Sequence, residues 1–386
     1  VGRLNNGMLS LNSNYALCKK DDIISNQKFS ALYTFRGLAK VPVEKVESGD
    51  IIAFSGIENI SIGDTVSDNE NPEALPRIEV DEPTVSMLFY VNDSPFAGQD
   101  GKFLTSRHLS ERLNKEILSN VSLQVIPTQR PNVFEVRGRG ELQMAVLIET
   151  MRREGYEFMV SKPEVITKEE NGKTLEPMER VYLDIPEDKV GVITEKLSTR
   201  KGKMANLQNH GSGRVNIEFV IPSRGLIGFR SQFMTDTQGA GIMNTLVEGF
   251  QPWFGLIPQR VSGALVADRN GKVTTYACVG MADRGELFTP VGTDVYDGMV
   301  IGERNREGDL NVNICREKKL TNMRASGSDN TVTIRPPRRL SLDQYIEFIA
   351  EDELVEVTPD NIRLRKMILD QNKRITQKRK EKYSSE

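Results

Sequence analysis

The order of the strands and helices expected between residues 84 and 250 constrains the fold more than any other feature of the sequence. A strand at 84–91 (TVSMLFYV) precedes a helix that begins near Thr105, and two strands, a second helix and a last strand follow. The same order starts again at residues 178–186 (MERVYLDIP). Because a βαββαβ order is typical of a ferredoxin-like domain, the repeat predicts two such domains in tandem.

The spacing of apolar residues supports the helices of both units. Apolar side chains recur at the intervals that place them on one face of a helix, which predicts one buried stripe for each helix. The expected buried positions are Met144, Leu147, Ile148 and Met151 in the first unit, and Val190, Ile193, Leu197, Leu226, Phe229 and Phe233 in the second.

Two further modules flank the tandem units. Residues 1–81 hold short strand-like runs between Gly, Asn, Asp and Ser, which predicts a small β-barrel, and the proline-containing residues 68–83 are expected to form a linker. The terminal module is expected to be mainly β, with one helix and a basic tail. Its expected strands are 260–267, 273–280, 310–316 and 330–336, and its expected helix is 341–350.

Two glycine-containing stretches imitate phosphate-binding loops. In RGRGELQ (137–143), the dinucleotide fingerprint would need a third glycine where Gln143 stands, and a parallel βαβ setting. We interpret Gly138 and Gly140 as a strand-to-helix joint in which glycine avoids backbone strain. In EENGKT (169–174), a P-loop would need a glycine where Thr167 stands. We therefore predict no nucleotide-hydrolysing site in this sequence.

The sequence contains few side chains suited to catalysis or to metal binding. The chain has two histidines and three cysteines, and no HExxH or CxxC pattern joins them. The cysteine usage favours a reducing, cytoplasmic setting, and no apolar run approaches the length of a membrane span. We predict no catalytic, cofactor-binding or metal-ligating residue.

Basic clusters are the better candidates for function. The formal net charge is -3, so a cationic tail on a mildly acidic body suggests a localised contact with a polyanion such as folded RNA. A solvated, frayed terminus explains the tail equally well. The predicted RNA- or ribosome-binding residues are Arg200, Lys201, Lys203, Arg316, Lys318, Lys319, Arg324, Arg363, Arg365, Lys366, Lys373 and Arg374.

Several motifs resemble translational GTPases related to elongation factor G. GRGELQMAVLIETMRREGYEFMVSKPEVI and EPMERVYLDIPEDKVGVITEKLSTRKG resemble their domains III and V, and VGRLNNG and SGDIIAFSGI their domain II. The direct join KPEVITKEENGKTLEPMERV, with IPSRGLIGFRSQFMTDTQG and KKLTNMRASGSDN, is similar to the BipA/TypA family specifically. The resemblance covers essentially the whole chain.

The resemblance implies a fold class that is multidomain α+β and β. It comprises a translation-factor β-barrel, two ferredoxin-like βαββαβ domains and a mixed, mainly-β C-terminal domain with a helix. The expected limits are 1–81 for the barrel, 82–172 and 173–250 for the two ferredoxin-like domains, and 251–386 for the C-terminal domain with basic loop 316–330. The barrel is expected to begin after its first strand, in a C-terminal fragment without the GTPase domain.

The resemblance also implies a function. The family's full protein is expected to be a ribosome-dependent GTPase at the factor site, linked to large-subunit assembly and to growth under cold and other stress. GTP and Mg²⁺ would be bound by an N-terminal domain, and the partners would be large-subunit rRNA and A-site tRNA. We expect a monomer off the ribosome, with no membrane partner. The alternatives are a regulatory protein that binds a small molecule between the tandem domains and, less favoured, a free-standing enzyme.

Overall fold

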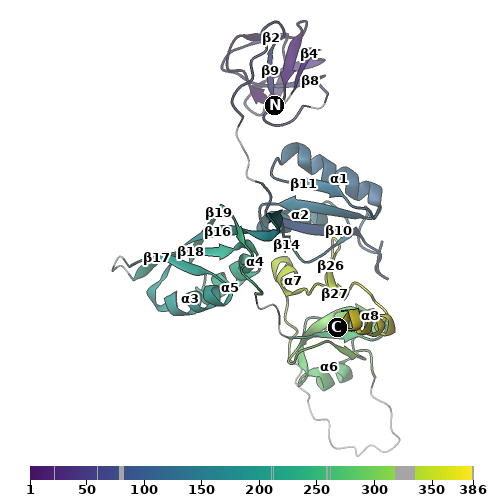
Figure 1. Ribbon diagram of the computed structural model, residues 1–386. Helices are drawn as coiled ribbons and strands as arrows, with labels where there is room; N and C mark the ends of the chain where they lie inside the picture. The colour runs from purple at the N-terminus through teal and green to yellow at the C-terminus, as the bar shows by residue number, and fades with distance from the viewer. Residues whose placement is uncertain are drawn as a thin grey trace, which may run out of the picture. The chain divides into compact units, whose positions relative to one another are not determined.

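The chain divides into two compact units, the first formed mainly by Val1–Asp81 and the second by most of the residues from Glu82 onward. The computed structural model describes residues 1–20, 22–58, 60–77, 82–209, 211, 213–257, 260, 262–317 and 335–384 (Figure 1). Within these ranges, no helix combines the length and the apolarity needed to cross a membrane. Most of the expected strand at 330–336 lies outside them.

The first unit consists of short strands around one apolar core. Its centre is formed by side chains such as Leu17, Leu32 and Ile52, which are at most 2% exposed. Its strands are β1 Gly2–Arg3, β2 Met8–Ser10, β3 Tyr15–Cys18, β4 Ile23–Gln27, β5 Ala31–Arg36, β6 Ala39–Pro42, β7 Lys45–Glu47, β8 Ile51–Ser55 and β9 Thr65–Asp68.

A closed barrel is not formed by the described strands of this unit, so the predicted closure is wrong. The strands make three separate sheets, in the orders β1-β8-β5-β6, β4-β3-β9 and β2-β7. Closure requires every strand to pair with a neighbour on each side. These strands have two to six residues, and left-handed turns such as Gly37 and Gly49 interrupt them, so each ladder ends before the next begins.

The second unit begins with a ferredoxin-like strand order, β11-β12-β10-β13, in which neighbours are antiparallel. The α2 stripe at Met144, Ile148 and Met151 is fully buried and packs with Leu113 of α1 against Phe89. The elements are β10 Val85–Val91, α1 Ser106–Ser119, β11 Gln124–Pro127, β12 Val133–Gly138, α2 Glu141–Arg153, β13 Phe158–Val160 and β14 Glu164–Val165.

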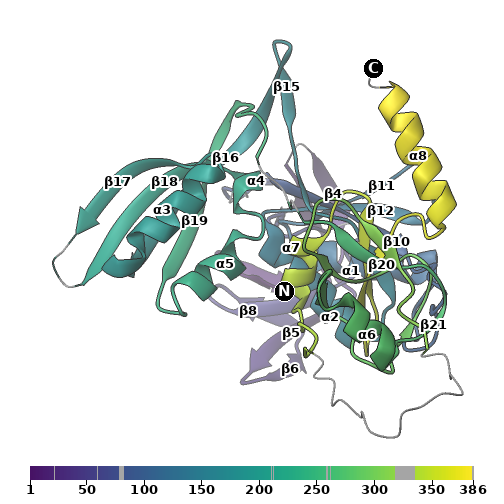
Figure 2. The ribbon, with the colours of Figure 1, turned by 90° about the horizontal axis from the view of Figure 1, so that it is seen from below.

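The next segment repeats this order in a separate sheet, β17-β18-β16-β19, with the hairpin strand β15 beside β16. Helices α3 and α5 cover one face of the sheet, where Ile193, Leu197, Phe229 and Phe233 are fully buried (Figure 2). The elements are β15 Lys168–Glu170, β16 Lys173–Pro186, the 3₁₀ turn η1 Glu187–Lys189, α3 Val190–Thr199, β17 Lys203–Asn209, β18 Arg214–Pro222, α4 Ser223–Leu226, α5 Phe229–Asp236 and β19 Ile242–Pro252.

The terminal module continues the sheet of the first ferredoxin-like unit. Strand β13 pairs with β26, and the order runs on as β26-β27-β24-β20-β25, giving an 11-stranded sheet with β14 and β22. The elements are β20 Ala264–Ala267, β21 Gly271–Lys272, α6 Thr275–Met281, β22 Gly285–Leu287, β23 Asp294–Val295, β24 Met299–Arg304, β25 Leu310–Val312, α7 Leu342–Phe348, β26 Glu353–Val357, β27 Ile362–Lys366 and α8 Gln371–Ser384.

The expected strand at 273–280 is wrong, because α6 occupies this segment. The Thr274 hydroxyl accepts a hydrogen bond from the backbone N–H of Ala277 and caps the helix. Ala277, Cys278 and Met281 are buried at helical spacing. The β-branched run VTT favoured a strand, but burying this one-sided stripe requires a helix. The expected α7 does form, with a capping box between Ser341 and Gln344.

The glycine-containing segment RGRGELQ is a strand-to-helix joint between β12 and α2. The Gln143 side chain accepts a hydrogen bond from the backbone N–H of Arg139 at 2.9 Å, so that donor is already used within the protein. Neither glycine has the positive φ that relieves strain. Gly138 serves close packing instead, since a Cβ there would lie 2.4 Å from Cε of Met144.

A glycine in the terminal module provides a stability test. Gly298 has φ +84, and a Cβ there would lie 2.6 Å from Cα of Leu369. We expect Gly298→Ala to lower the free energy of unfolding by about 3 kcal/mol, because backbone must move. Gly292→Ala is the control, since Gly292 has φ +87 but no atom near its Cβ, and should cost about 1 kcal/mol. Urea unfolding followed by circular dichroism measures both, and equal costs would contradict this packing.

Candidate nucleic-acid interface

The end of α3 and the start of β17 present two predicted cations to solvent. Lys201 has φ +68 and follows the helix, and Lys203 opens the strand, with both side chains exposed. The Lys203 Nζ lies 4.8 Å from the centroid of the Phe254 ring. A cation beside an aromatic face can bind a phosphate and a base together.

Trp253 and Phe254, two neighbouring aromatic residues close to Lys203, were not identified as candidates by the sequence analysis. Trp253 is 43% exposed, and the Arg224 guanidinium lies 3.8 Å from the centroid of its ring. The fully buried Glu176 holds this arrangement, because it pairs with Arg224 and accepts from the N–H of Phe254 at 2.7 Å. The available signal was the chain's single tryptophan, followed by phenylalanine at a strand end.

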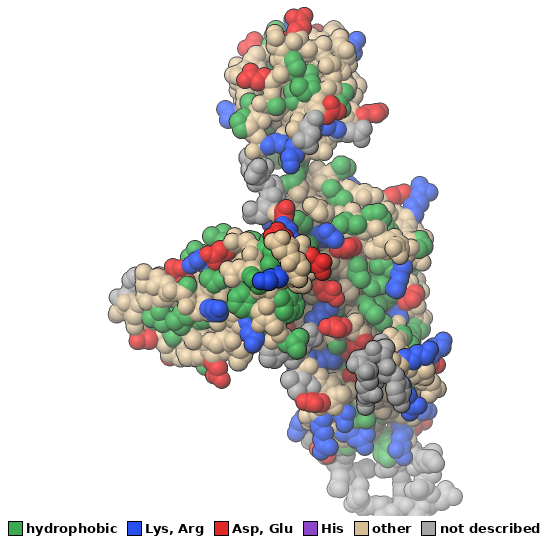
Figure 3. Space-filling view, in the orientation of Figure 1, with side chains coloured by type: hydrophobic (Ala, Val, Ile, Leu, Met, Phe, Trp, Pro, Cys, Tyr) green, Lys and Arg blue, Asp and Glu red, His purple; other side chains and the backbone are tan. Residues whose placement is uncertain are grey.

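The terminal module exposes a second cation beside an aromatic ring. Arg316 is exposed, and its guanidinium lies 5.8 Å from the centroid of the Tyr276 ring on α6. The hydroxyl of Thr274 donates a 2.6 Å hydrogen bond to the Arg316 carbonyl, which ties this residue to the start of α6. Figure 3 shows Lys and Arg side chains gathered over the terminal module, at the bottom of the view.

Helix α8 carries the third set of exposed cations. Asp370 accepts a hydrogen bond from the backbone N–H of Lys373 at 2.8 Å and precedes the helix Gln371–Ser384. Lys373, Arg379 and Lys380 are exposed along it. Figure 2 shows α8 extending away from the strands of the terminal module.

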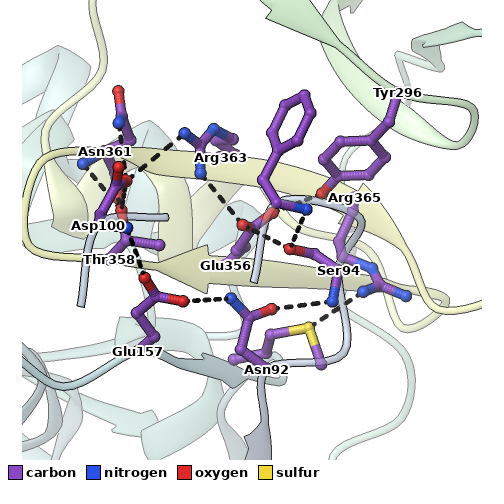
Figure 4. Close-up of polar contacts among 12 residues, drawn as sticks. Asn92, Ser94, Asp100, Glu157, Tyr296, Glu356, Thr358, Asn361, Arg363 and Arg365 are labelled. Atoms are coloured by element: carbon purple, nitrogen blue, oxygen red, sulfur yellow. Dashed lines mark hydrogen bonds and ion pairs between the residues drawn. The ribbon is translucent and has the colours of Figure 1, made fainter. Parts of the chain in front are cut away.

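The structure uses other predicted cations in its own interior. Arg363 pairs with the buried Glu356 at 3.1 Å (Figure 4). Arg365, only 3% exposed, pairs with Asp93 at 2.6 Å. These pairs join β27 to β26 and to the loop after β10. Both guanidinium groups therefore form ion pairs within the chain, and we no longer propose these two arginines as RNA-binding residues.

Lys366 is the most enclosed of these cations. Its Nζ lies 2.7 Å from Asp309, 3.0 Å from Asp352 and 2.9 Å from Glu353. Burial acts to lower the pKa of the ammonium group, but the three carboxylates outweigh it and raise the pKa above its usual value. Lys366 therefore stays charged as an internal counter-ion.

Arg200 and Arg374 also form hydrogen bonds within the protein. Arg200 donates to the carbonyls of Gly225 and Ile227 at 3.0 and 2.9 Å, and burial lowers the pKa of its guanidinium. Arg374 donates to the carbonyl of Ile368 at 2.9 Å and to Asn311 at 2.6 Å. Neither is carried into the RNA-binding set. Lys318, Lys319 and Arg324 lie outside the described residues, so their predicted contact stays a prediction.

Comparisons with known proteins match both parts of the C-terminal half. Residues 262–371 match the family model described as TypA/BipA C-terminal domain, and residues 173–261 match the one described as Elongation factor G C-terminus. A crystal structure of a protein from Thermus thermophilus aligns at a TM-score of 0.40 and 13% identity, over 64% of this chain and 52% of that one. That likeness is too low to support an argument.

Curated relatives extend the match over nearly the whole chain. Each is named Large ribosomal subunit assembly factor BipA. The protein from Bacillus subtilis (strain 168) is 44% identical over 99% of this chain and 63% of its own length. Those from Synechocystis sp. and Escherichia coli (strain K12) are both 46% identical, over 95% and 97% of this chain and 62% of their own length. The chain therefore spans less than two thirds of these relatives.

Replacing an internal cation should affect stability, and replacing an exposed one should not. We expect Lys366→Met to lower the free energy of unfolding by about 3 kcal/mol, because three carboxylates lose their buried counter-ion. Lys373→Met should leave the urea midpoint unchanged. Since the folded pKa of Lys366 is raised, this contribution is present below the ordinary lysine pKa and is lost as pH rises through the folded value. Equal midpoints for the two variants would contradict the internal role.

Proposed function

We propose that this chain, which is similar to proteins named Large ribosomal subunit assembly factor BipA, belongs to the BipA/TypA family and binds the ribosome through folded RNA as part of a translational GTPase that acts in large-subunit assembly. The observation that carries the proposal is the separation of the cations into two classes. One class is used in internal ion pairs and hydrogen bonds. The other class is exposed, and two of its members, Lys203 and Arg316, lie beside aromatic rings. Exposed cations release counter-ions when they meet phosphates, which makes binding strong and salt-sensitive.

The distribution of the exposed cations over two modules supports this proposal. Lys203 belongs to the second ferredoxin-like sheet and Trp253 directly follows its strand β19, while Tyr276, Arg316 and α8 belong to the terminal module. Proteins recognise structured RNA mainly by its shape and by stacking on unpaired bases. Folded modules that each present a cation–aromatic surface suit a large folded RNA better than a short strand.

The finer assignments are also part of the proposal. We assign the second ferredoxin-like domain to the factor site, and the terminal module with loop 316–330 to the A site, its rRNA and its tRNA. The whole protein would hydrolyse GTP with Mg²⁺ in the cytoplasm as a monomer, under cold and other stress. None of the described residues is assigned to GTP or to Mg²⁺. The proposed domain limits remain 1–81, 82–172, 173–250 and 251–386.

A small-molecule regulator is the alternative, and one feature bears on it. A hollow of about 210 Å³ lies between α2, α5 and α7. Two of its carboxyl groups already bond to the protein, since Glu141 accepts from the N–H of Gly228 and Glu347 accepts from Gln232. We therefore prefer RNA binding.

Charge removal at the exposed sites tests the proposal. The experiment is co-sedimentation of the chain with 70S ribosomes across a potassium chloride series. We expect Lys201→Ala with Lys203→Ala to weaken binding and to reduce the slope of log affinity against log salt by about one to two, one phosphate per cation. The triple variant Lys318→Ala, Lys319→Ala, Arg324→Ala should reduce the slope by about two to three.

Arg107→Ala provides the matched control. Arg107 is exposed but pairs with Glu111 on α1, away from the cation–aromatic surfaces, so its removal should leave the slope unchanged. No association of the unmodified chain at low salt would refute the proposed function. Unchanged slopes in both cation variants would remove these residues from the interface.

A further inference from the structure

The first ferredoxin-like unit and the terminal module form one body through their shared sheet. Residues 158–160 of β13 pair with residues 355–357 of β26 in an antiparallel ladder. The second ferredoxin-like unit has its own sheet, which that ladder does not reach. It therefore meets the shared-sheet body through helices and side chains, and these contacts can change without breaking a strand pairing.

A bend between α4 and α5 makes the central contact between these two parts. Gly228 adopts φ +73 there, and its backbone N–H donates to Oε2 of Glu141 on α2 at 2.7 Å. On the other side, a Cβ at Gly228 would lie 2.4 Å from Cγ of Glu347 on α7. Gln232 of α5 donates to Oε1 of Glu347 at 2.9 Å. The bend is thus enclosed by the first ferredoxin-like unit and the terminal module together.

Arg200, which belongs to the second ferredoxin-like unit, holds the bend in place. It donates to the carbonyls of Gly225 and Ile227 at 3.0 and 2.9 Å, and to Oε1 of Gln232 at 3.2 Å. The guanidinium thereby bridges the backbone before Gly228 and the side chain that contacts Glu347. If the bend moved, Arg200 and Gln232 would move with it or lose these hydrogen bonds.

Three carboxyl groups and few cations surround the hollow beside the bend. Glu141 comes from α2, and Asp343 and Glu347 come from α7, while Arg230 of α5 also lines the hollow and Arg200 approaches from the end of α3. Burial raises the pKa of the Glu141 carboxyl to about 7, and the charges of Glu347 and Asp343 act in the same direction. The Gly228 N–H and Arg200 act in the opposite direction.

We propose that Glu141, Gly228 and Glu347 form a proton-sensitive latch that holds the second ferredoxin-like unit against the shared-sheet body, and that loss of the Glu141 proton weakens it. Protonated, Glu141 still accepts from Gly228 and adds no charge beside Glu347. Ionised, it places a second carboxylate in an enclosed space. Repulsion and burial then favour separation of the bend from α2 and α7, where water can solvate both groups.

The direction of the pH effect follows from proton linkage. The latched state binds the Glu141 proton more tightly than an opened state, in which the carboxyl regains its ordinary pKa of 4.5. The latch is therefore strongest below pH 4.5, weakens as the pH rises towards 7, and changes little above that. Between about pH 5.5 and 7.5 the opening equilibrium should rise on the order of tenfold.

Hydrogen exchange measured by mass spectrometry tests the latch. Exchange of backbone amides in peptides covering 225–236 and 341–349 is followed from about pH 5.5 to 8.5 and corrected for the intrinsic pH dependence. We expect the opening equilibrium of the unmodified chain to rise on the order of tenfold by about pH 7.5. Glu141→Gln, which keeps the acceptor but cannot ionise, should stay at the low-pH value throughout.

Two further variants separate titration from simple structural damage. Glu141→Ala lacks the acceptor for Gly228 and should show fast exchange at every pH. Glu149→Gln is the matched control on the same helix, where Glu149 pairs with Arg153 away from the bend, and should follow the unmodified profile. A flat profile for the unmodified chain, or a rise in Glu141→Gln equal to that of the unmodified chain, would overturn the latch.

Discussion

The pairing of β13 with β26 is the interaction on which the described arrangement of the second unit depends. Three residues on each strand convert a four-stranded ferredoxin-like sheet and a separate C-terminal sheet into one ladder. Buried polar groups reinforce the junction, since Glu356 of β26 accepts from Ser94, in the loop after β10, at 2.8 Å (Figure 4). Breaking the junction would leave these groups without partners in a low-dielectric interior, which costs far more than the loss of a surface pair.

The same junction decides which cations are available to a partner. Arg363, Arg365 and Lys366 lie close together on β27, and the sheet places acidic side chains of β26 and of neighbouring loops against them. Lys203 and Arg316 instead are exposed. A basic run in sequence is therefore a poor guide to an RNA-binding surface, because a strand in a mixed sheet can bury every one of its charges in internal pairs.

Local patterns predicted the helices and strands well where a single periodicity dominated. The apolar stripes of α2, α3 and α5 follow from spacing, and the helix expected at 341–350 forms as α7. Residues 273–280 were misassigned because β-branched residues favour a strand locally, while Cys278 and Met281 gain burial only in a helix. The barrel closure failed for a related reason, since strand-like runs do not reveal whether short ladders connect. Trp253 was missed because a lone aromatic has no periodicity to interpret.

The sequence by itself determined the two βαββαβ units, the strand-to-helix joint at RGRGELQ, and the similarity to BipA proteins. These features depend on the spacing of residue types along the chain, which is visible in the sequence itself. Only the tertiary structure decided that β13 joins β26, that five of the predicted cations are used internally, and that Glu141 faces Gly228 and Glu347. Those features bring together residues that are far apart in the chain, as Arg152 and Thr358 illustrate with a separation of 206 positions. The charge and burial of such groups follow from their neighbours in space, which no local pattern contains.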